Sequence, residues 1–143
     1  MWTDTQIAYL AGIIDGEGTI YVQVRKRGEC FDYFPRFQVV NTDRGLMEWI
    51  HSTFGGILVQ KDRSKHSKKW RLQYQWFTSR GVMDDLLKKV IPYLICKKPH
   101  ALAMLEFRKT FWNKKSHKVS EETLSIRTEI FHRLKSLNKR GVH

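Results

Sequence analysis

The sequence predicts an α+β domain with a four-stranded, mostly antiparallel β-sheet. Four segments alternate apolar and polar residues with a period of two, which is the pattern of half-buried strands. These segments come in two pairs, and segments with helical periodicity precede, separate and follow the pairs. The resulting order of helix, hairpin, helix, hairpin and further helices is typical of α+β proteins. No low-complexity linker interrupts residues 1–143, so we expect a single domain.

The first helix is predicted to begin at Thr3 and to end at two glycines. Thr3 and Gln6 form a Ser/Thr-x-x-Gln capping box, in which each side chain binds the backbone N–H of the other residue. Gly16 and Gly18 follow the last apolar residue of the pattern, and glycine commonly ends a helix. The apolar residues between these ends share one helical face: Ile7, Leu10, Ala11 and Ile14.

The first hairpin is predicted from strands over residues 19–27 and 33–41, with a loop over residues 28–32. Its inward residues are Ile20, Val22, Val24, Phe37 and Val39. A helix over residues 43–54 follows, and Gly55 and Gly56 end it. The residues of this helix that we expect in the core are Leu46, Trp49, Ile50 and Phe54.

The second hairpin is predicted from residues 57–62, a basic connector and residues 70–77. In its last strand the inward residues are Trp70, Leu72, Tyr74 and Trp76. Ser79 is the expected N-cap of a third helix, which reaches to about Ile91 before Pro92. Two more helices are predicted over residues 98–112 and 120–138, with Ser120 as the N-cap of the last.

The composition favours a nucleic-acid partner inside the cell. The formal net charge of +12 points to a polyanion, although a soluble protein can also be basic without such a partner. Cys30 and Cys96 form no Cys-x-x-Cys pair, which favours a reducing interior over a disulfide or zinc framework. No apolar run reaches the roughly 20 residues of a membrane span, and no secretory signal pattern is visible. We therefore expect an intracellular protein of the cytoplasm, nucleoid or an organelle, without a membrane partner.

The stretch LAGIIDGEG, residues 10–18, combines small residues along a helix with acids at its end. Ala8, Gly12 and Gly16 are spaced by four residues and form a stripe of small side chains. Such a stripe allows a second helix to approach closely, whereas the alternative is a helix crowded against its own sheet. Because glycine costs about 1 kcal/mol in a helix interior, we favour the contact with a second helix.

Asp15 and Glu17 lie at the C-terminal end of this helix, where the helix dipole disfavours negative charge. Two carboxylates in this place indicate a bound cation, and oxygen ligands of this kind suit Mg²⁺. In a basic protein, carboxylates with a hard cation are typical of phosphodiester cleavage. The alternative is a polar loop with no ligand.

Polar residues on the predicted strands and in the connector form a candidate DNA-binding surface. Arg and Gln read base edges bidentately, and a β-ribbon fits the major groove. The alternatives are an ordinary solvated sheet face and a solvated charge run. The strand residues are Tyr21, Gln23, Arg25, Arg27, Arg36, Gln38, Arg71, Gln73 and Gln75. The connector residues, which we expect to contact phosphates, are Lys61, Arg63, Lys65, Lys68 and Lys69.

Residues 10–18 resemble the signature of the LAGLIDADG homing endonucleases, with Glu17 in place of the second aspartate. The resemblance extends over nearly the whole chain: a hairpin after the motif, a second helix ending in Gly-Gly, and a second hairpin. A Pro-Tyr-Leu segment followed by lysine, and the closing residues 137–141, continue it. The family implies a saddle-shaped αββαββα domain whose sheet straddles double-stranded DNA. Because the motif occurs once, the resemblance implies a homodimer in which Ala8, Gly12 and Gly16 form the interface.

The resemblance also implies the site residues. Glu17 would hold Mg²⁺, or another divalent cation such as Mn²⁺, with the carbonyl of Gly16 as a further ligand. Lys97 matches a lysine that assists near the scissile phosphate, with Lys98 as the alternative if the alignment shifts by one residue. Asn41 matches a polar residue that positions water. The remaining acid, Asp15, is more often structural, and Arg44 lies close to a basic position of the family but off its register.

The function implied is site-specific double-strand DNA cleavage at a long pseudo-palindromic target, as in intron homing. The alternative is a non-catalytic nucleic-acid binder of the same fold, either an intron RNA maturase or a DNA-binding regulator. Glu17 and Lys97 are both present, and this favours the enzyme. A generic RNA-binding protein would leave the acids of the motif unexplained.

Overall fold

A computed structural model describes residues 1–62, 72–111 and 119–139 of the chain. These residues gather in two compact units. Unit 1 comprises Met1–Thr19 and the described residues of Phe37–Ile95, and unit 2 comprises Ile20–Arg36 and the described residues from Cys96 on. The expectation of a single domain is not tested by this division and stays a prediction. The predicted α+β class and four-stranded antiparallel sheet are confirmed.

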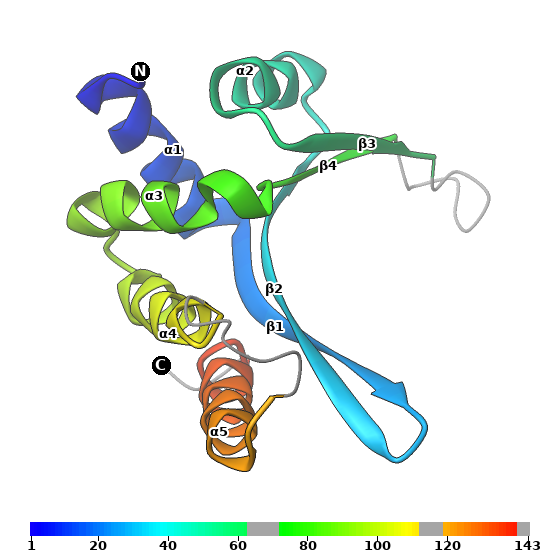
Figure 1. The fold of residues 1–143 in the computed structure, drawn as a ribbon. Coiled ribbons are helices and arrows are strands. Elements are labelled where there is room, and N and C mark those ends of the chain that lie inside the picture. Colours follow the sequence, from blue (N-terminus) through cyan, green and yellow to red (C-terminus); the bar gives the residue numbers. More distant parts are fainter. Residues whose placement is uncertain (63–71, 112–118, 140–143) are drawn as a thin grey trace. The chain divides into compact units, whose positions relative to one another are not determined.

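The order of the elements is the predicted one (Figure 1). The strands have the order β1-β2-β4-β3 in the sheet, and β4 pairs antiparallel with both β2 and β3. The strands are β1 (Gly18–Arg27), β2 (Cys30–Asn41), β3 (Ile57–Lys61) and β4 (Gln73–Phe77). The helices are α1 (Asp4–Glu17), α2 (Arg44–Phe54), α3 (Arg80–Val90), the 3₁₀ turn η1 (Ile91–Tyr93), α4 (Lys98–Lys109) and α5 (Glu121–Leu137).

In unit 1, α1 packs against α3 and η1, and α2 packs on β3 and β4. The capping box at Thr3 and Gln6 is present with both of its hydrogen bonds, so the predicted start of the first helix is confirmed. The predicted apolar face of α1 is buried at all four positions. Val39 and Trp76 are paired across β2 and β4, and both side chains are buried.

Gly55 and Gly56 end α2 as predicted, and the structure shows why the second position requires glycine. Both residues have positive φ, +72° and +84°. A Cβ at Gly56 would lie 2.2 Å from the carbonyl oxygen of Phe77, and no rotation of a side chain relieves a contact with backbone. The indole N–H of Trp76 donates to the carbonyl of Gly55 at 2.6 Å, which ties the end of α2 to β4.

Several local predictions were wrong. The loop predicted over residues 28–32 is only a turn at Gly28 and Glu29, where the positive φ of Gly28 permits a tight reversal. Leu46 and Trp49 are only half-buried, and Met47 occupies the core of α2 instead. Ser79 does occupy the predicted N-cap position of α3, although its side chain accepts no capping hydrogen bond.

Other predicted elements differ in their ends. The last strand begins at Gln73 rather than residue 70, which lies outside the described residues, and Leu72 is only half-buried before it. Val24 is half-buried rather than buried. The helix predicted to end at residue 112 ends at Lys109. Ser120 does cap α5, because its hydroxyl accepts from the N–H of Thr123 at 3.1 Å.

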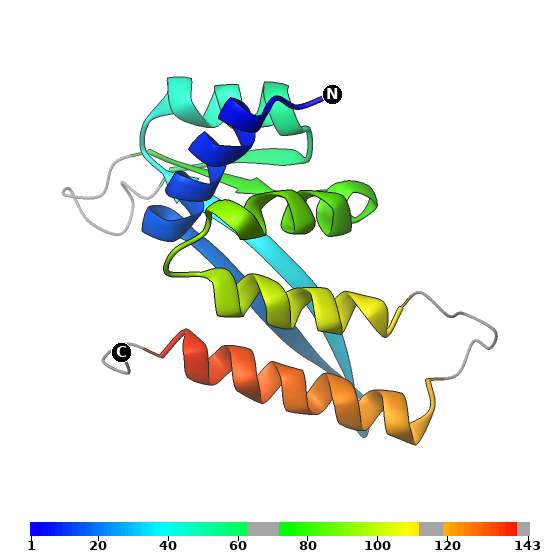
Figure 2. The same cartoon turned by 90° about the vertical axis from the view of Figure 1, so that its left-hand side faces the viewer.

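Unit 2 combines the hairpin of β1 and β2 with two helices, α4 and α5, which lie side by side and run antiparallel (Figure 2). The Tyr33 ring contacts Phe131 of α5 at 5.7 Å between centroids, and Thr128 donates to the Tyr33 hydroxyl at 3.1 Å. At the other end of the helix, the Asn138 amide donates to the carbonyl of Ile20 at 2.9 Å. The hairpin is therefore attached to α5 at two separate places.

Among the described residues, no helix combines the length and the apolar character needed to cross a bilayer.

Candidate active site and strand face

The two acids of the motif have different surroundings. Asp15 is half-buried, and its Oδ2 accepts a hydrogen bond from the backbone N–H of Ile95 at 2.8 Å. This bond ties α1 to the segment that follows η1, and it supports a structural role for Asp15. Glu17 is the last residue of α1 and is exposed to solvent, and no basic residue occupies the last turn. The carboxylate at Glu17 is thus accessible to a ligand.

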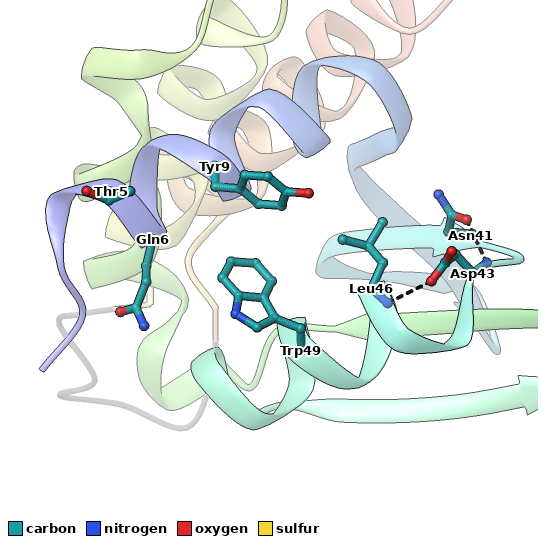
Figure 3. Close-up of a pocket in the computed structure, with 7 residues that line it drawn as sticks. All are labelled: Thr5, Gln6, Tyr9, Asn41, Asp43, Leu46 and Trp49. Atoms are coloured by element: carbon teal, nitrogen blue, oxygen red, sulfur yellow. Dashed lines mark hydrogen bonds between the residues drawn. The ribbon is translucent and has the colours of Figure 1, made fainter.

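A short hydrogen-bonded chain connects Glu17 to the start of α2. The Asn41 side-chain amide donates to Oε2 of Glu17. The amide oxygen of Asn41 accepts from the backbone N–H of Asp43 at 2.8 Å, and Oδ1 of Asp43 accepts from the N–H of Leu46 at 2.9 Å (Figure 3). The N-cap of α2 therefore fixes the orientation of Asn41, and Asn41 in turn holds one oxygen of the Glu17 carboxylate. The structure thus brings the side chains of Glu17 and Asn41 into contact, while the catalytic roles predicted for them stay predictions.

The small-residue stripe of α1 faces open space. A Cβ built at Gly12 or Gly16 would have no atom of this chain within 4 Å, and both residues are exposed. Ala8, the third residue of the stripe, is half-buried. The alternative of a helix crowded against its own sheet is therefore wrong for these two glycines. Nothing in the described part of the chain requires glycine at either position.

Two hollows flank this face of α1, and both lie within unit 1. One of about 490 Å³ is lined by Ala8, Tyr9, Gly12, Ile13, Gly16, Glu17, Asn41 and Leu46. The other, of about 810 Å³, is lined by Thr5, Gln6, Tyr9, Asn41, Asp43, Leu46 and Trp49 (Figure 3). Tyr9 is 57% exposed and meets Trp49 edge-on at 5.1 Å between ring centroids. Leu46 and Trp49, which were predicted to lie in the core, line this hollow and are therefore only half-buried.

Lys97 belongs to unit 2, whereas Glu17 belongs to unit 1, so their predicted meeting stays a prediction. Lys97 is the half-buried N-cap residue of α4, and Lys98 is the first residue of that helix. Burial lowers the pKa of His100 on the next turn, the positive charge of Lys97 lowers it further, and a hydrogen bond to the Leu137 backbone opposes both effects. The charge of Lys97 therefore acts on a buried residue of the helix that it precedes.

Arg44, whose role the family resemblance leaves open, forms an ion pair on the surface of α2. Its Nε donates to Oε1 of Glu48 at 2.7 Å, and this bond and the charge of Glu48 raise the pKa of Arg44. The pair links successive turns of one exposed helix face. It gives no sign that Arg44 is directed toward Glu17.

In unit 2, the outer face of the hairpin carries cations that are held by neighbours on the other strand. Nε of Arg36 donates to Oε1 of Gln23 at 2.7 Å. The guanidinium of Arg25 lies 5.3 Å from the centroid of the Phe34 ring, and Arg27 lies 3.6 Å from the carboxylate of Asp32. Tyr21 is half-buried on the same strand. Sequence reasoning missed Phe34 and Asp32, although their period-two spacing from Arg36 was a usable signal.

In unit 1, the predicted Gln residues share their sheet face with apolar side chains. Gln73 and Gln75 alternate with buried Tyr74 and Trp76, as predicted. The register places Gln75 opposite Val40 and Val59, Gln38 opposite Phe77, and Lys61 opposite Gln73. This part of the face is therefore less purely polar than the sequence predicted. The predicted residues Arg63, Lys65, Lys68, Lys69 and Arg71 lie outside the described residues.

Comparison with known proteins identifies the fold. No protein-family model matches the sequence, and no curated protein sequence matches it. The structure, however, superposes on the homing endonuclease I-CvuI in complex with its target with a TM-score of 0.78, at 19% identity over 98% of this chain and 86% of the other. The chain has the fold of the LAGLIDADG homing endonucleases. The resemblance inferred from residues 10–18 is thereby confirmed.

Two other homing endonuclease structures are similar to this chain. The archaeal intron-encoded homing endonuclease I-Vdi141I, complexed with DNA, gives a TM-score of 0.79 at 18% identity, over 98% of this chain and 88% of the other. The LAGLIDADG homing endonuclease I-GzeII, in complex with its DNA target, gives 0.71 at 18% identity, over 87% of this chain and 43% of the other. This chain thus corresponds to about half of I-GzeII and to most of I-CvuI and I-Vdi141I.

Proposed function

We propose that this chain is a site-specific, divalent-metal-dependent DNA endonuclease that cleaves both strands of a long pseudo-palindromic target as a homodimer. The fold, shared with homing endonucleases solved on DNA, supports a DNA endonuclease role. The observation that carries the proposal is the accessible carboxylate of Glu17 at the foot of α1, beside a glycine face that the chain itself does not use. An intracellular location remains part of the proposal.

The residues around Glu17 suit a hard cation. Glu17 offers a carboxylate, Gly16 offers a backbone carbonyl, and the dipole of α1 places partial negative charge at the same end. Among residues 1–62, 72–111 and 119–139, no group of three His, Cys, Asp or Glu side chains gathers as a metal site. Mg²⁺ commonly takes one or two carboxylates and completes its shell with water and phosphate, so this donor set fits Mg²⁺ or Mn²⁺.

The chain's own residues would divide the work of phosphodiester hydrolysis. When bound, the cation supplies acidified water and offsets charge on the phosphate. Glu17 would hold the cation, and Asn41 would keep the Glu17 carboxylate in one orientation through its own bond to the backbone of Asp43. Lys97 contributes a positive charge toward the charge that develops on the phosphate. Cleaving both strands requires two such sites, and each chain carries the motif once and so supplies one Glu17.

The experiment that tests the chemistry is a gel shift beside a cleavage assay on one selected target. Glu17→Gln keeps the size of the side chain but removes its charge, so cleavage is expected to fall by about three orders of magnitude or more. DNA binding is expected to persist, because a negative charge facing phosphate is removed. The matched control is Glu122→Gln, which neutralises an exposed acid of α5 and leaves cleavage unchanged. Cleavage by Glu17→Gln at the wild-type rate would contradict the proposed role.

The homodimer is tested by Gly12→Leu. The open space around Gly12 lets the monomer accept the side chain, whereas a second helix packed on this face would be displaced. We expect the variant to run as a folded monomer in light scattering. Gly81→Leu is the matched control, because Gly81 is also an exposed helical glycine with no atom within 4 Å, and this variant should stay dimeric. A wild-type monomer that still cut both strands would overturn the dimer.

The non-catalytic alternative predicts a different outcome in the same assays. A maturase or DNA-binding regulator would bind nucleic acid with and without the Glu17 carboxylate, and it would not cut under any divalent cation. Comparing duplex DNA with RNA of the same sequence in the gel shift separates these two binders from each other.

A further inference from the structure

The chain passes from unit 1 to unit 2 in the segment that joins η1 to α4, and two successive residues of unit 1 are held there in different ways. The side chain of Leu94 is buried, and its N–H donates to the carbonyls of Val90 and Ile91 at 3.1 and 3.2 Å. The side chain of Ile95 is 85% exposed, so its burial cannot hold the chain. Instead, the Ile95 N–H donates to Oδ2 of Asp15 at 2.8 Å, which ties the last residue of unit 1 to α1.

The bond at Asp15 lies, along the chain, between two residues of the proposed site. Glu17 follows Asp15 by two residues and ends the same helix. On the other side, one residue separates Ile95 from Lys97, the N-cap residue of α4. Because consecutive Cα atoms are about 3.8 Å apart, the Cα of Lys97 lies within about 7.6 Å of that of Ile95. A single hydrogen bond thus links the helix that carries the proposed metal ligand to the backbone that leads to the lysine.

An acid is an unfavourable choice at this end of α1 unless its bond has a use. The helix dipole disfavours a carboxylate there, and the last turn of the helix contains no basic residue. However, a bond from a backbone N–H to an ionised carboxylate is stronger than one to a neutral acceptor. We propose that Asp15 is a positioning residue, which through Ile95 sets the distance between Lys97 and the cation site at Glu17. This inference rests on the proposed endonuclease function.

This role differs from general support of the fold. Lys97 acts through its charge on the phosphate, and a displacement of about 1 Å can lower a rate by about 100-fold. If Asp15 acts through Lys97, the two residues contribute to one interaction, so losing the second should add little once the first is gone. General support of the fold would instead be lost to the same extent with or without Lys97.

The test is a double-mutant cycle on the single-turnover cleavage rate of a selected target with saturating Mg²⁺. Asp15→Ala removes the acceptor, and cleavage is expected to fall by about 10- to 100-fold. In the Lys97→Met protein, the same change should lower the remaining rate by less than about threefold. The Mg²⁺ concentration that gives half-maximal rate should keep its wild-type value in Asp15→Ala, because Glu17 is intact.

Two further measurements separate the bond from the charge of Asp15. Asp15→Asn keeps an oxygen that can accept from the Ile95 N–H, so this variant should cut several times faster than Asp15→Ala. In protein without divalent metal, exchange of the Ile95 amide proton, followed by NMR, should be faster in Asp15→Ala than in the wild type and intermediate in Asp15→Asn.

Removing the donor instead of the acceptor covers the case in which Asp15→Ala does not fold. Ile95→Pro eliminates the N–H and leaves α1 unaltered. Leu94 before it already has an extended backbone, with φ −73° and ψ 139°, which a residue preceding proline favours. Ile95→Ala is the matched control, because it also loses the exposed side chain but keeps the N–H. We expect Ile95→Pro to cut at least about tenfold more slowly than Ile95→Ala.

Equal losses from Asp15→Ala with and without Lys97 would overturn the inference, as would a raised Mg²⁺ requirement in Asp15→Ala. Equal rates for Ile95→Pro and Ile95→Ala would also overturn it. A rate for Asp15→Asn no better than that of Asp15→Ala would do the same, because the charge and not the bond would then matter. These outcomes leave the endonuclease proposal intact. Failure of the wild type to cut any selected duplex would instead contradict the endonuclease proposal, and the inference with it.

Discussion

Asn41 at the foot of the motif helix and Gln23 on the first hairpin carry the same amide group, but the charged neighbours that these two groups contact have opposite signs. Asn41 donates to the carboxylate of Glu17 and uses its oxygen to accept from the backbone of Asp43. Gln23 uses its oxygen to accept from Nε of Arg36 at 2.7 Å. An adjacent charge therefore decides which edge of a neutral amide is presented.

The comparison shows how the same amide group can support an anion at one place and a cation at another in one basic protein. Near Glu17 the amide supports an anion, and that anion stays accessible to a cation. On the hairpin the amide oxygen supports a cation, the guanidinium of Arg36. Hydrogen bonds to charged groups are stronger than those between neutral groups, so both arrangements are expected to persist in solution.

The largest effect on cleavage is expected from removing the hydrogen bond that Asn41 donates to the Glu17 carboxylate. Asn41→Leu removes the bond to Glu17 and leaves that side chain free to rotate, so cleavage should fall by about 10- to 100-fold, as is common when a residue that orients a metal ligand is lost. The Mg²⁺ concentration that gives half-maximal rate should rise, whereas affinity for DNA measured by gel shift should not change. An unaltered Mg²⁺ dependence would show that Asn41 does not orient Glu17.

A smaller effect is expected one step further along the same chain of bonds. Asp43→Ala removes the side-chain cap of α2 and should lower the free energy of unfolding, measured with urea, by about 1 kcal/mol. Ser79→Ala is the matched control, because Ser79 precedes α3 without a capping hydrogen bond and its loss should cost less. Equal losses in the two variants would contradict the importance of the Asp43 cap.

The smallest effect is expected on the hairpin, at an exposed ion pair. The side chain of Arg27 is 81% exposed, so its 3.6 Å contact with Asp32 should contribute no more than about 0.5 kcal/mol to stability. Asp32→Asn should therefore leave the melting temperature nearly unchanged. It should tighten binding to all DNA sequences severalfold at low salt, because one acid is removed from a basic face. A large loss of stability would mean that the pair organises the hairpin.

The sequence alone determined the order of elements, the start of α1 and the fold class. These features depend on local chemistry: the capping box at Thr3, the period-two alternation of the strands and the glycines after α2 all act within a few residues. The motif of residues 10–18 also placed Glu17 at a helix end, because helical spacing follows directly from the residue order.

Only the tertiary structure decided which side chains meet. Leu46 and Trp49 fit the helical pattern of a core, yet they line a hollow because the neighbouring face of α2 carries Met47 and Ile50 into the interior. The bond between Asp15 and Ile95 and the bond between Gln23 and Arg36 join residues that are distant in sequence. The space around Gly12 depends on which other parts of the chain lie near it. Periodicity assigns a side chain to a face, but the partners on that face come from strand pairing and helix packing.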